Sequence, residues 1–170
     1  MKTSLVLTVL GPDRTGLVDD VADAVAKNGG SWQQSRMARL AGQFAGILRV
    51  ECPEENREAL EANLSALGER GLIVTVARDS ESEESKGETL SLDITGLDEA
   101  GIVKRIASAL AELGVNVEEL QTSLESAPMA GHLLFCTRGK VSLPDGLHPT
   151  ELIEALEKVG AGLNVDVQAL

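Results

Sequence analysis

The sequence predicts an α+β protein built from two consecutive βαββαβ units, each with a four-stranded antiparallel sheet backed by two helices. Three observations support this fold class. The chain repeats itself at a spacing of 85 residues, its apolar residues follow strand and helix periodicity in the same order in both halves, and an acidic stretch separates the halves. With right-handed crossovers, this order of elements gives the ferredoxin-like layout.

The repeat is clearest where a predicted strand turns into a predicted helix. The aligned landmarks are Gly11 with Gly96, Asp13 with Asp98, Gly16 with Gly101 and Gly29 with Gly114. The same spacing aligns Ala45-Gly46 with Ala130-Gly131, and later leucines match after a small insertion that we place at 140–147. Identity at so many structurally meaningful positions indicates a duplication.

The repeat and the composition together predict the domain boundaries. We expect an N-terminal domain at 1–79, an acidic linker at 80–88 and a C-terminal domain at 89–170. The segment between the copies is polar and has no apolar anchors, so burial cannot offset the entropy lost when it becomes ordered.

Apolar periodicity places the individual elements. Strands are predicted at 5–10, 31–40, 43–52 and 72–77 in the first half, and at 90–95, 115–124, 132–138 and 163–169 in the second. The predicted helix stripes are Leu17, Val21, Ala22 and Val25; Leu60, Leu64 and Leu67; Ile102, Val103, Ile106, Leu110 and Leu113; and a last helix at 150–159. Asp13 is the expected N-cap of the first helix.

Composition and charge exclude several function classes. A net charge of −12 and an aromatic content of 2% argue against a surface that binds nucleic acid directly. No apolar run reaches the roughly 18 to 20 residues of a membrane-spanning helix. Cys52 and Cys136 have no metal or redox spacing, which favours reduced thiols in a cytoplasmic protein, although the sequence leaves a disulfide open.

The sequence offers no constellation of catalytic or metal-binding residues. His132, predicted inside a strand, and His148, predicted at a helix start, have no cysteine or carboxylate at ligand spacing. No nucleophile elbow, ordered Ser/His/Asp set or His-activated cysteine is apparent. We therefore expect a protein that is not an enzyme and that needs no cofactor or metal.

The two strand-to-helix loops, 11–16 and 96–101, are the candidate binding sites. Free backbone N–H groups and the positive end of the helix dipole meet at such a point and suit a carboxylate or phosphate. Gly16 and Gly101 let a ligand approach closely, or they permit tight packing of helix on sheet, and the residues leave both interpretations open. A phosphate loop is excluded, because apolar residues replace the required Lys and Ser/Thr after each second glycine.

These motifs resemble the ACT domain. The Asp-x-x-Gly-hydrophobic-Val step occurs in both copies, and the second copy adds Asn116 within Gly-Val-Asn-Val. The segments 11–18, 34–38 and 42–45 are further similar to the glycine cleavage system transcriptional repressor family. The resemblance covers nearly the whole chain, including the tandem arrangement.

The resemblance implies a ligand and a set of site residues. ACT domains bind small ligands, mostly amino acids, between paired domains. The implied residues are Asp13, Arg14, Thr15, Gly16, Leu17 and Ser31 in the first copy, and Asp98, Glu99, Ala100, Gly101, Ile102 and Asn116 in the second. Because Ser31 stands where the second copy has Asn116, the two sites should be unequal, and the second fits the pattern better.

The implied function is regulation without catalysis. The chain would sense an amino acid, glycine above all, and modulate transcription of glycine cleavage genes by contacting a DNA-bound activator. A regulatory subunit of an amino-acid metabolic enzyme and a tandem scaffold with empty sites remain alternatives. Exposed sheet edges also lead us to expect a homodimer.

Three other residues keep two interpretations each. Trp32 either anchors an interface or packs on a strand face as part of the core. Arg36 and Arg39 lie three apart on a predicted strand and therefore on opposite faces, so that one could meet an acidic ligand or partner while the other faces water.

Overall fold

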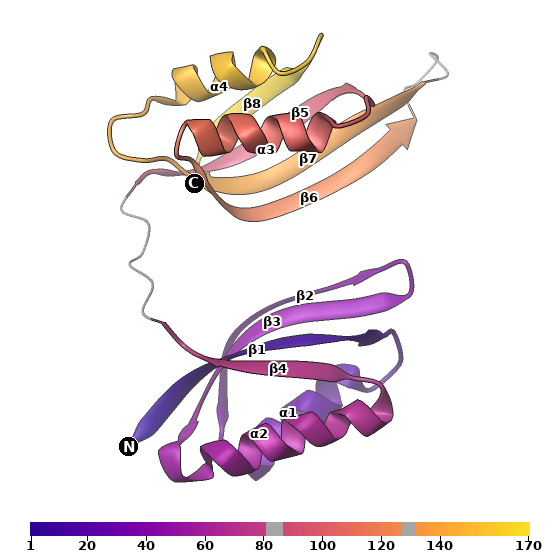
Figure 1. The fold of residues 1–170 in the computed structure, drawn as a ribbon, viewed down its shortest axis with the longest axis vertical. Coiled ribbons are helices and arrows are strands. Elements are labelled where there is room, and N and C mark those ends of the chain that lie inside the picture. Colours follow the sequence, from indigo (N-terminus) through magenta and orange to yellow (C-terminus); the bar gives the residue numbers. More distant parts are fainter. Residues whose placement is uncertain (81–86, 127–131) are drawn as a thin grey trace. The chain divides into compact units, whose positions relative to one another are not determined.

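The computed structural model describes residues 1–80, 87–126 and 132–170 of the chain. The chain divides into two compact units, Met1–Ser82 and Glu83–Leu170, which are described separately (Figure 1). Most of the predicted acidic linker, 80–88, lies outside the described residues. Each unit contains one sheet and its own helices, as the predicted α+β class requires.

The first unit has the predicted βαββαβ order. Its strands and helices are β1 (Lys2–Pro12), α1 (Leu17–Lys27), β2 (Ser31–Leu40), β3 (Gln43–Pro53), α2 (Arg57–Ala66) and β4 (Ile73–Arg78). Short 3-10 turns at Glu54–Asn56 and Leu67–Arg70 flank α2. The sheet order is β2-β3-β1-β4, and every neighbouring pair is antiparallel.

The second unit repeats this topology. Its elements are β5 (Thr89–Leu97), α3 (Ile102–Glu112), β6 (Asn116–Ser126), β7 (Leu133–Ser142), α4 (Pro149–Glu157) and β8 (Asn164–Ala169). The antiparallel order β6-β7-β5-β8 corresponds strand for strand to the first sheet. The prediction of two ferredoxin-like units is confirmed.

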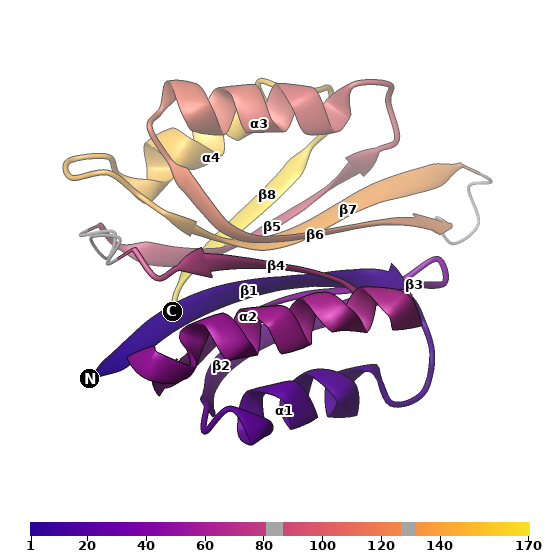
Figure 2. The same ribbon diagram turned by 60° about the horizontal axis from the view of Figure 1, so that its bottom comes forward.

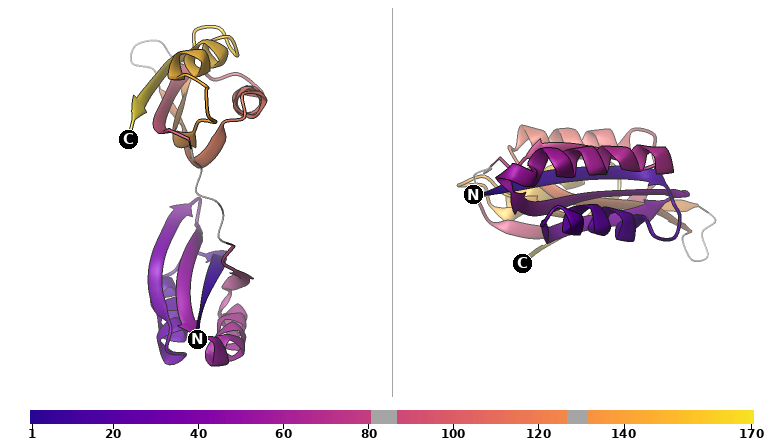
Figure 3. Two further views of the ribbon diagram at one scale, coloured as in Figure 1. Left: turned by 90° about the vertical axis from the view of Figure 1, so that its left-hand side faces the viewer. Right: turned by 90° about the horizontal axis from the view of Figure 1, so that it is seen from below.

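Both helices of each unit lie on one face of that unit's sheet (Figures 2 and 3). Strand alternation explains the core beneath them: Leu5, Leu7 and Val9 are fully buried, whereas Thr8 and Leu10 between and beyond them are exposed. Leu60 and Leu64 of α2 fill the same cluster. The second unit has a separate core of equivalent composition, so each unit carries its own apolar centre.

The strand registers correct the predicted alignment of the two halves. Ser4 pairs with Glu51, and its equivalent Thr89 pairs with Ser142. The offset between equivalent residues of the two units is therefore 85 in β1 and β5 but 91 in β3 and β7. Glu125 pairs with Leu134 as Leu40 pairs with Gln43, so the extra residues lie mainly between positions 125 and 134, not at 140–147. The aligned pair Ala130-Gly131 lies in 127–131, outside the described residues, and Ala45 instead corresponds to Cys136.

Two predicted positions at element ends are wrong. The N-cap of α1 is Gly16, at φ 89°, and not Asp13, whose backbone N–H instead donates to the carbonyl oxygen of Gly42 at 2.9 Å. The left-handed turn at the glycine delays the helix by one turn. His132 precedes β7, which begins at Leu133.

Three predicted helix-stripe residues are not buried. Ala22 and Leu113 are only half-buried and Val103 is 45% exposed, while Ala24 of α1 is buried instead. The helices turn Leu17, Val21 and Val25 to the sheet, and the equivalent Ile102, Ile106 and Leu110 in the second unit. The exposure of Val103 is relevant to the site described below.

Candidate functional site

The strand-to-helix loop of the second unit forms a short turn that is fastened to its own helix. Gly101, at φ 80°, caps α3, and the backbone N–H of Ile102 donates to the carbonyl oxygen of Glu99 at 3.1 Å. The guanidinium of Arg105 donates to the Glu99 carboxylate at 2.7 Å. A left-handed conformation at Gly101 favours glycine, since a side chain there costs about 1–2 kcal/mol.

This loop lines an open cavity of about 430 Å³. Its lining residues are Asp98, Glu99, Ala100, Gly101, Ile102, Val103, Thr122, Ser123, Leu124 and Phe135. The structure thus gathers five residues that the sequence analysis assigned to one site and adds five that it missed. The added residues come from the first turn of α3, the end of β6 and the start of β7.

Sheet topology explains why the end of β6 meets this loop. Strands β5 and β6 both run antiparallel to β7, so their C-terminal ends lie at the same end of the sheet. A β-bulge between Val117 and Glu119 shifts the alternation, and Leu124 pairs with the buried Phe135 on the helix side. The βαββαβ order could have indicated the contribution of β6, but the bulge has no sequence signal that we recognise.

The cavity combines an acidic edge with an apolar wall. Asp98 and Glu99 supply carboxylates, and Glu99 is already paired with Arg105. Thr122 contributes a hydroxyl that can donate or accept. Ile102, Val103, Leu124 and Phe135 form the apolar wall, of which Leu124 is 53% exposed. Such a surface suits a small molecule with a cationic group and an apolar part.

Asn116 lies away from this cavity. It is the first residue of β6, whereas Thr122 to Leu124 lie near the other end of the strand. Six residues of extended chain span about 20 Å. Asn116 instead lines a different cavity of about 280 Å³, together with Gly114, Ser142 and Pro144 among others. The implied contact of Asn116 with a ligand on the loop therefore does not form within this unit.

In the first unit, an ion pair joins the loop to β2. Arg39 of β2 pairs with Asp13 at 2.6 Å. The offset of 85 residues makes Asp13 equivalent to Asp98 and Arg39 equivalent to Leu124. The sheets agree, because Arg39 pairs with Phe44 as Leu124 pairs with Phe135. The first unit's equivalents of Asp98 and Leu124, which line the cavity in the second unit, thus form an ion pair with each other.

The remaining predicted residues of the first unit are tied down or distant. Leu17 is buried, Arg14 donates to the Thr15 carbonyl oxygen at 3.3 Å, and Gly16 caps α1. Ser31 starts β2, where its hydroxyl accepts a hydrogen bond from Gln33 at 3.0 Å. As with Asn116, the strand separates it from the loop.

Each loop is also fastened to its own helix by an ion pair. In the first unit the loop carries the positive residue and the helix the negative one, and in the second unit the signs are reversed. Arg14 pairs with Asp20 at 2.6 Å in the first unit, and the equivalent Glu99 pairs with Arg105 at 2.7 Å in the second. Arg70 forms a second ion pair with Asp20. The hydrogen bond from Arg14, with the charge of Arg70, holds the pKa of Asp20 below its usual value of 3.8.

This lowered pKa predicts an acid-dependent loss of stability. Asp20→Asn removes the charge, so the wild type should be more stable than the variant at pH 7. A pKa that is lowered in the folded state means that folding favours the ionised carboxylate over the protonated one. The difference in unfolding free energy between wild type and variant should therefore persist down to about pH 5 and shrink as the pH falls below about 4. Urea unfolding at pH 7, 5 and 3 measures it.

Asp19→Asn is the matched control for this prediction. Asp19 lies beside Asp20 in the first turn of α1 but is exposed. It should show no comparable pH-dependent difference. Equal behaviour of the two variants, or a difference for Asp20→Asn that does not change with pH, would contradict the role given to the arginine pairs.

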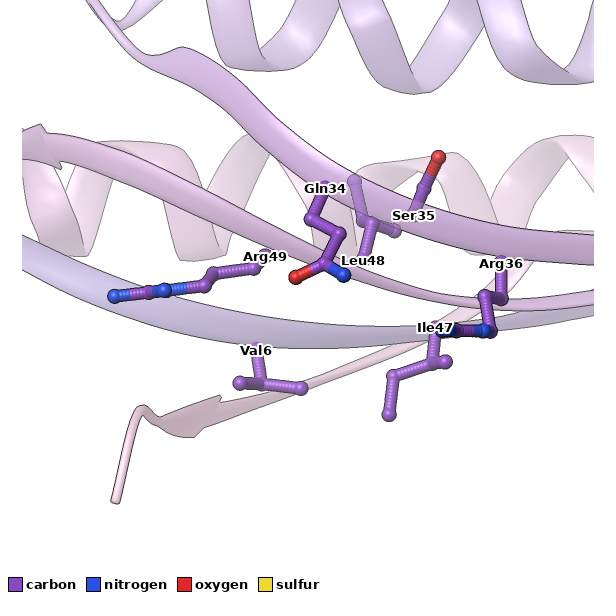
Figure 4. Close-up of a pocket in the computed structure, with 7 residues that line it drawn as sticks. All are labelled: Val6, Gln34, Ser35, Arg36, Ile47, Leu48 and Arg49. Atoms are coloured by element: carbon purple, nitrogen blue, oxygen red, sulfur yellow. The ribbon is translucent and has the colours of Figure 1, made fainter. Parts of the chain in front are cut away.

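A second cavity, of about 230 Å³, lies on the first unit's sheet. Figure 4 shows Val6, Gln34, Arg36, Ile47 and Arg49 on one side of the strands and Leu48 pointing to the other. The expectation that Arg36 and Arg39 occupy opposite faces is met, because Arg36 lines this cavity and Arg39 pairs with Asp13. Arg49 is engaged by Asp79 at 2.7 Å.

The other candidate residues have structural positions. Trp32 is partly buried against the first unit's core, which favours the core interpretation. His148 caps α4, and its backbone N–H donates to Glu151 at 3.0 Å. Cys52 and Cys136 are free thiols, and burial raises the pKa of Cys52. Within the described ranges, no cluster of three or more His, Cys, Asp or Glu side chains could hold a metal ion.

The same described ranges contain no helix that is both long and apolar enough to cross a membrane.

Comparisons with known proteins bear on the fold of the chain. The ACT-domain family model matches residues 3–77. An unknown protein from Galdieria sulphuraria is 31% identical, with a TM-score of 0.84, over 100% of this chain and 99% of that chain. A protein proposed to be a glycine cleavage system transcriptional repressor is 18% identical, with a TM-score of 0.70, over 100% of this chain and 99% of that chain. No curated protein matches the chain.

The fold and these matches define a tandem arrangement of two α+β domains with the ferredoxin-like topology. The first unit matches the ACT-domain family over residues 3–77, and the second unit has the same topology. Over its whole length the chain also resembles the proposed glycine cleavage repressor in fold, so the resemblance predicted from the sequence is confirmed.

Proposed function

We propose that the chain is a non-catalytic regulator that binds a small amino acid at the second unit's loop cavity and passes this signal to a protein partner. One observation carries the proposal: residues 98–102 converge on a single open cavity whose lining offers carboxylate, hydroxyl and apolar groups. A zwitterion presents matching groups, an ammonium and a carboxylate, on one small molecule.

The likeness to a protein proposed to repress glycine cleavage genes supports the choice of ligand and partner to test first. Glycine is that first ligand, and a DNA-bound transcriptional activator is that first partner. The net charge of −12 supports an indirect role, because such a chain is repelled by nucleic acid. A cytoplasmic location is part of the proposal.

Ligand binding regulates only if two states differ in affinity for the ligand. The state that contacts the partner and the state that does not must bind the amino acid unequally, and the shift between them equals that difference. The exposed ion pair of Glu99 with Arg105, which fastens the loop through side chains, can rearrange at small cost.

Calorimetric titration of the full chain with the proteinogenic amino acids tests the proposal. We expect saturable binding of at least one of them, with about one site per chain, and a rise in melting temperature that grows with ligand concentration. The absence of binding by every amino acid at millimolar concentration would refute ligand sensing. A gel shift of DNA by the chain alone would refute the indirect role.

A further inference from the structure

The cavity of the second unit exposes more apolar surface than a glycine site needs. Val103 is 45% exposed and Leu124 is 53% exposed, and both face the same cavity as the buried Phe135. Exposed large apolar side chains that gather at one concave place mark a binding surface more often than scattered ones do. The wall they form has an aliphatic side from Ile102, Val103 and Leu124 and an aromatic side from Phe135.

The volume of the cavity also favours a ligand larger than glycine. A volume of about 430 Å³ lies within the range of about 300 to 1,000 Å³ typical of small-molecule sites. Glycine has no side chain and would leave the apolar wall in contact with water. A ligand with an apolar side chain would remove that wall from water and gain the corresponding free energy.

The charged residues that line the cavity determine which charged groups the ligand can carry. The ionisable side chains among the described residues that line the cavity are the carboxylates of Asp98 and Glu99. Because Arg105 already pairs with Glu99, Asp98 is the group best placed to attract an ammonium. The same carboxylates repel a second negative charge, so an acidic side chain is disfavoured.

We infer that this cavity takes an α-amino acid with a branched aliphatic or aromatic side chain, in preference to glycine and to acidic amino acids. The inference rests on the proposed function and narrows its ligand. The ammonium lies at Asp98, the hydroxyl of Thr122 is available to the ligand carboxylate, and the side chain covers Val103, Leu124 and Phe135.

The first unit supports this assignment by contrast. Its equivalent of Leu124 is Arg39, which is bonded to Asp13 at 2.6 Å. That ion pair occupies both the carboxylate and the position of the apolar wall. We therefore assign one such site to each chain, in the second unit.

Titration with a graded series of amino acids tests the inference. Affinity should rise from glycine through alanine and valine to leucine and phenylalanine, by up to about fourfold for each methylene that becomes buried. Aspartate should bind more weakly than alanine.

Leu124→Arg tests the position of the wall by giving the second unit the first unit's residue. The new guanidinium should pair with Asp98 and lower leucine affinity by at least about tenfold. Leu120→Arg is the matched control, because Leu120 is similarly exposed, at 45%, on the same face of β6 but outside the cavity lining. It should bind leucine like the wild type.

The outcomes separate this inference from the proposed function. If glycine binds as tightly as leucine and Leu124→Arg abolishes the binding of both, the proposed function is retained and the assigned ligand class is wrong. If no amino acid binds, the proposed function itself fails. If leucine binds equally to the wild type and to Leu124→Arg, the apolar wall is not the binding surface and the inference is overturned.

Discussion

Gly101→Leu should lower amino-acid affinity by at least about tenfold and leave the second unit folded. A Cβ at Gly101 meets no heavy atom within 4 Å, so the new side chain has room where it leaves the backbone. It would extend from the loop that borders the cavity and compete with the ligand for the same space. The left-handed φ of 80° adds a stability cost of about 1–2 kcal/mol. Calorimetric titration and urea unfolding measure the two effects.

Gly146→Leu separates the two effects of the Gly101 change. Gly146 also has a positive φ, of 86°, and a Cβ there would likewise meet no heavy atom within 4 Å, but it lies in the loop between β7 and α4. This control should lose similar stability and keep full affinity. Equal affinities for both variants would show that the loop cavity is not the ligand site.

Leu92→Ala should destabilise the second unit by about 2–5 kcal/mol. Leu92 lies in β5 and is fully buried within the second unit's core cluster. Truncation removes apolar contacts and leaves a cavity that the packed neighbours cannot fill. Because each unit has its own core, hydrogen exchange should accelerate in β5 and β7 while β1 and β3 keep their protection.

Leu97→Ala is the control for this core truncation. Leu97 ends the same strand but is 47% exposed, so its loss should change stability by no more than about 0.5 kcal/mol. A loss of protection that spreads equally through both units would contradict the assignment of separate cores.

The fold could be predicted because local pattern and tertiary environment agree. Leu5, Leu7 and Val9 alternate because one face of β1 is covered by helices, and the repeat doubled the evidence for each element. The errors fell where local signals compete. Asp13 is a good N-cap residue, but the left-handed turn at Gly16 starts the helix later, and the extra residues between β6 and β7 hid the change in spacing at β3.

The site could be predicted only in its contiguous part. Residues 98–102 adjoin one another in sequence and share a cavity. Thr122, Leu124 and Phe135 reach it through strand pairing and a β-bulge, which depend on contacts between distant residues. Asn116 was assigned through family resemblance, and the direction of β6 places it near the far end of the strand.

The exchanged ion pairs also match each loop to the helix of its own unit. A recombinant that joined the first unit's loop to the second unit's helix would set Arg14 beside Arg105, and the reciprocal product would set Glu99 beside Asp20. Like charges at that spacing repel and would loosen the start of the helix. Neither loop can therefore replace the other without losing the ion pair that fastens it to the helix.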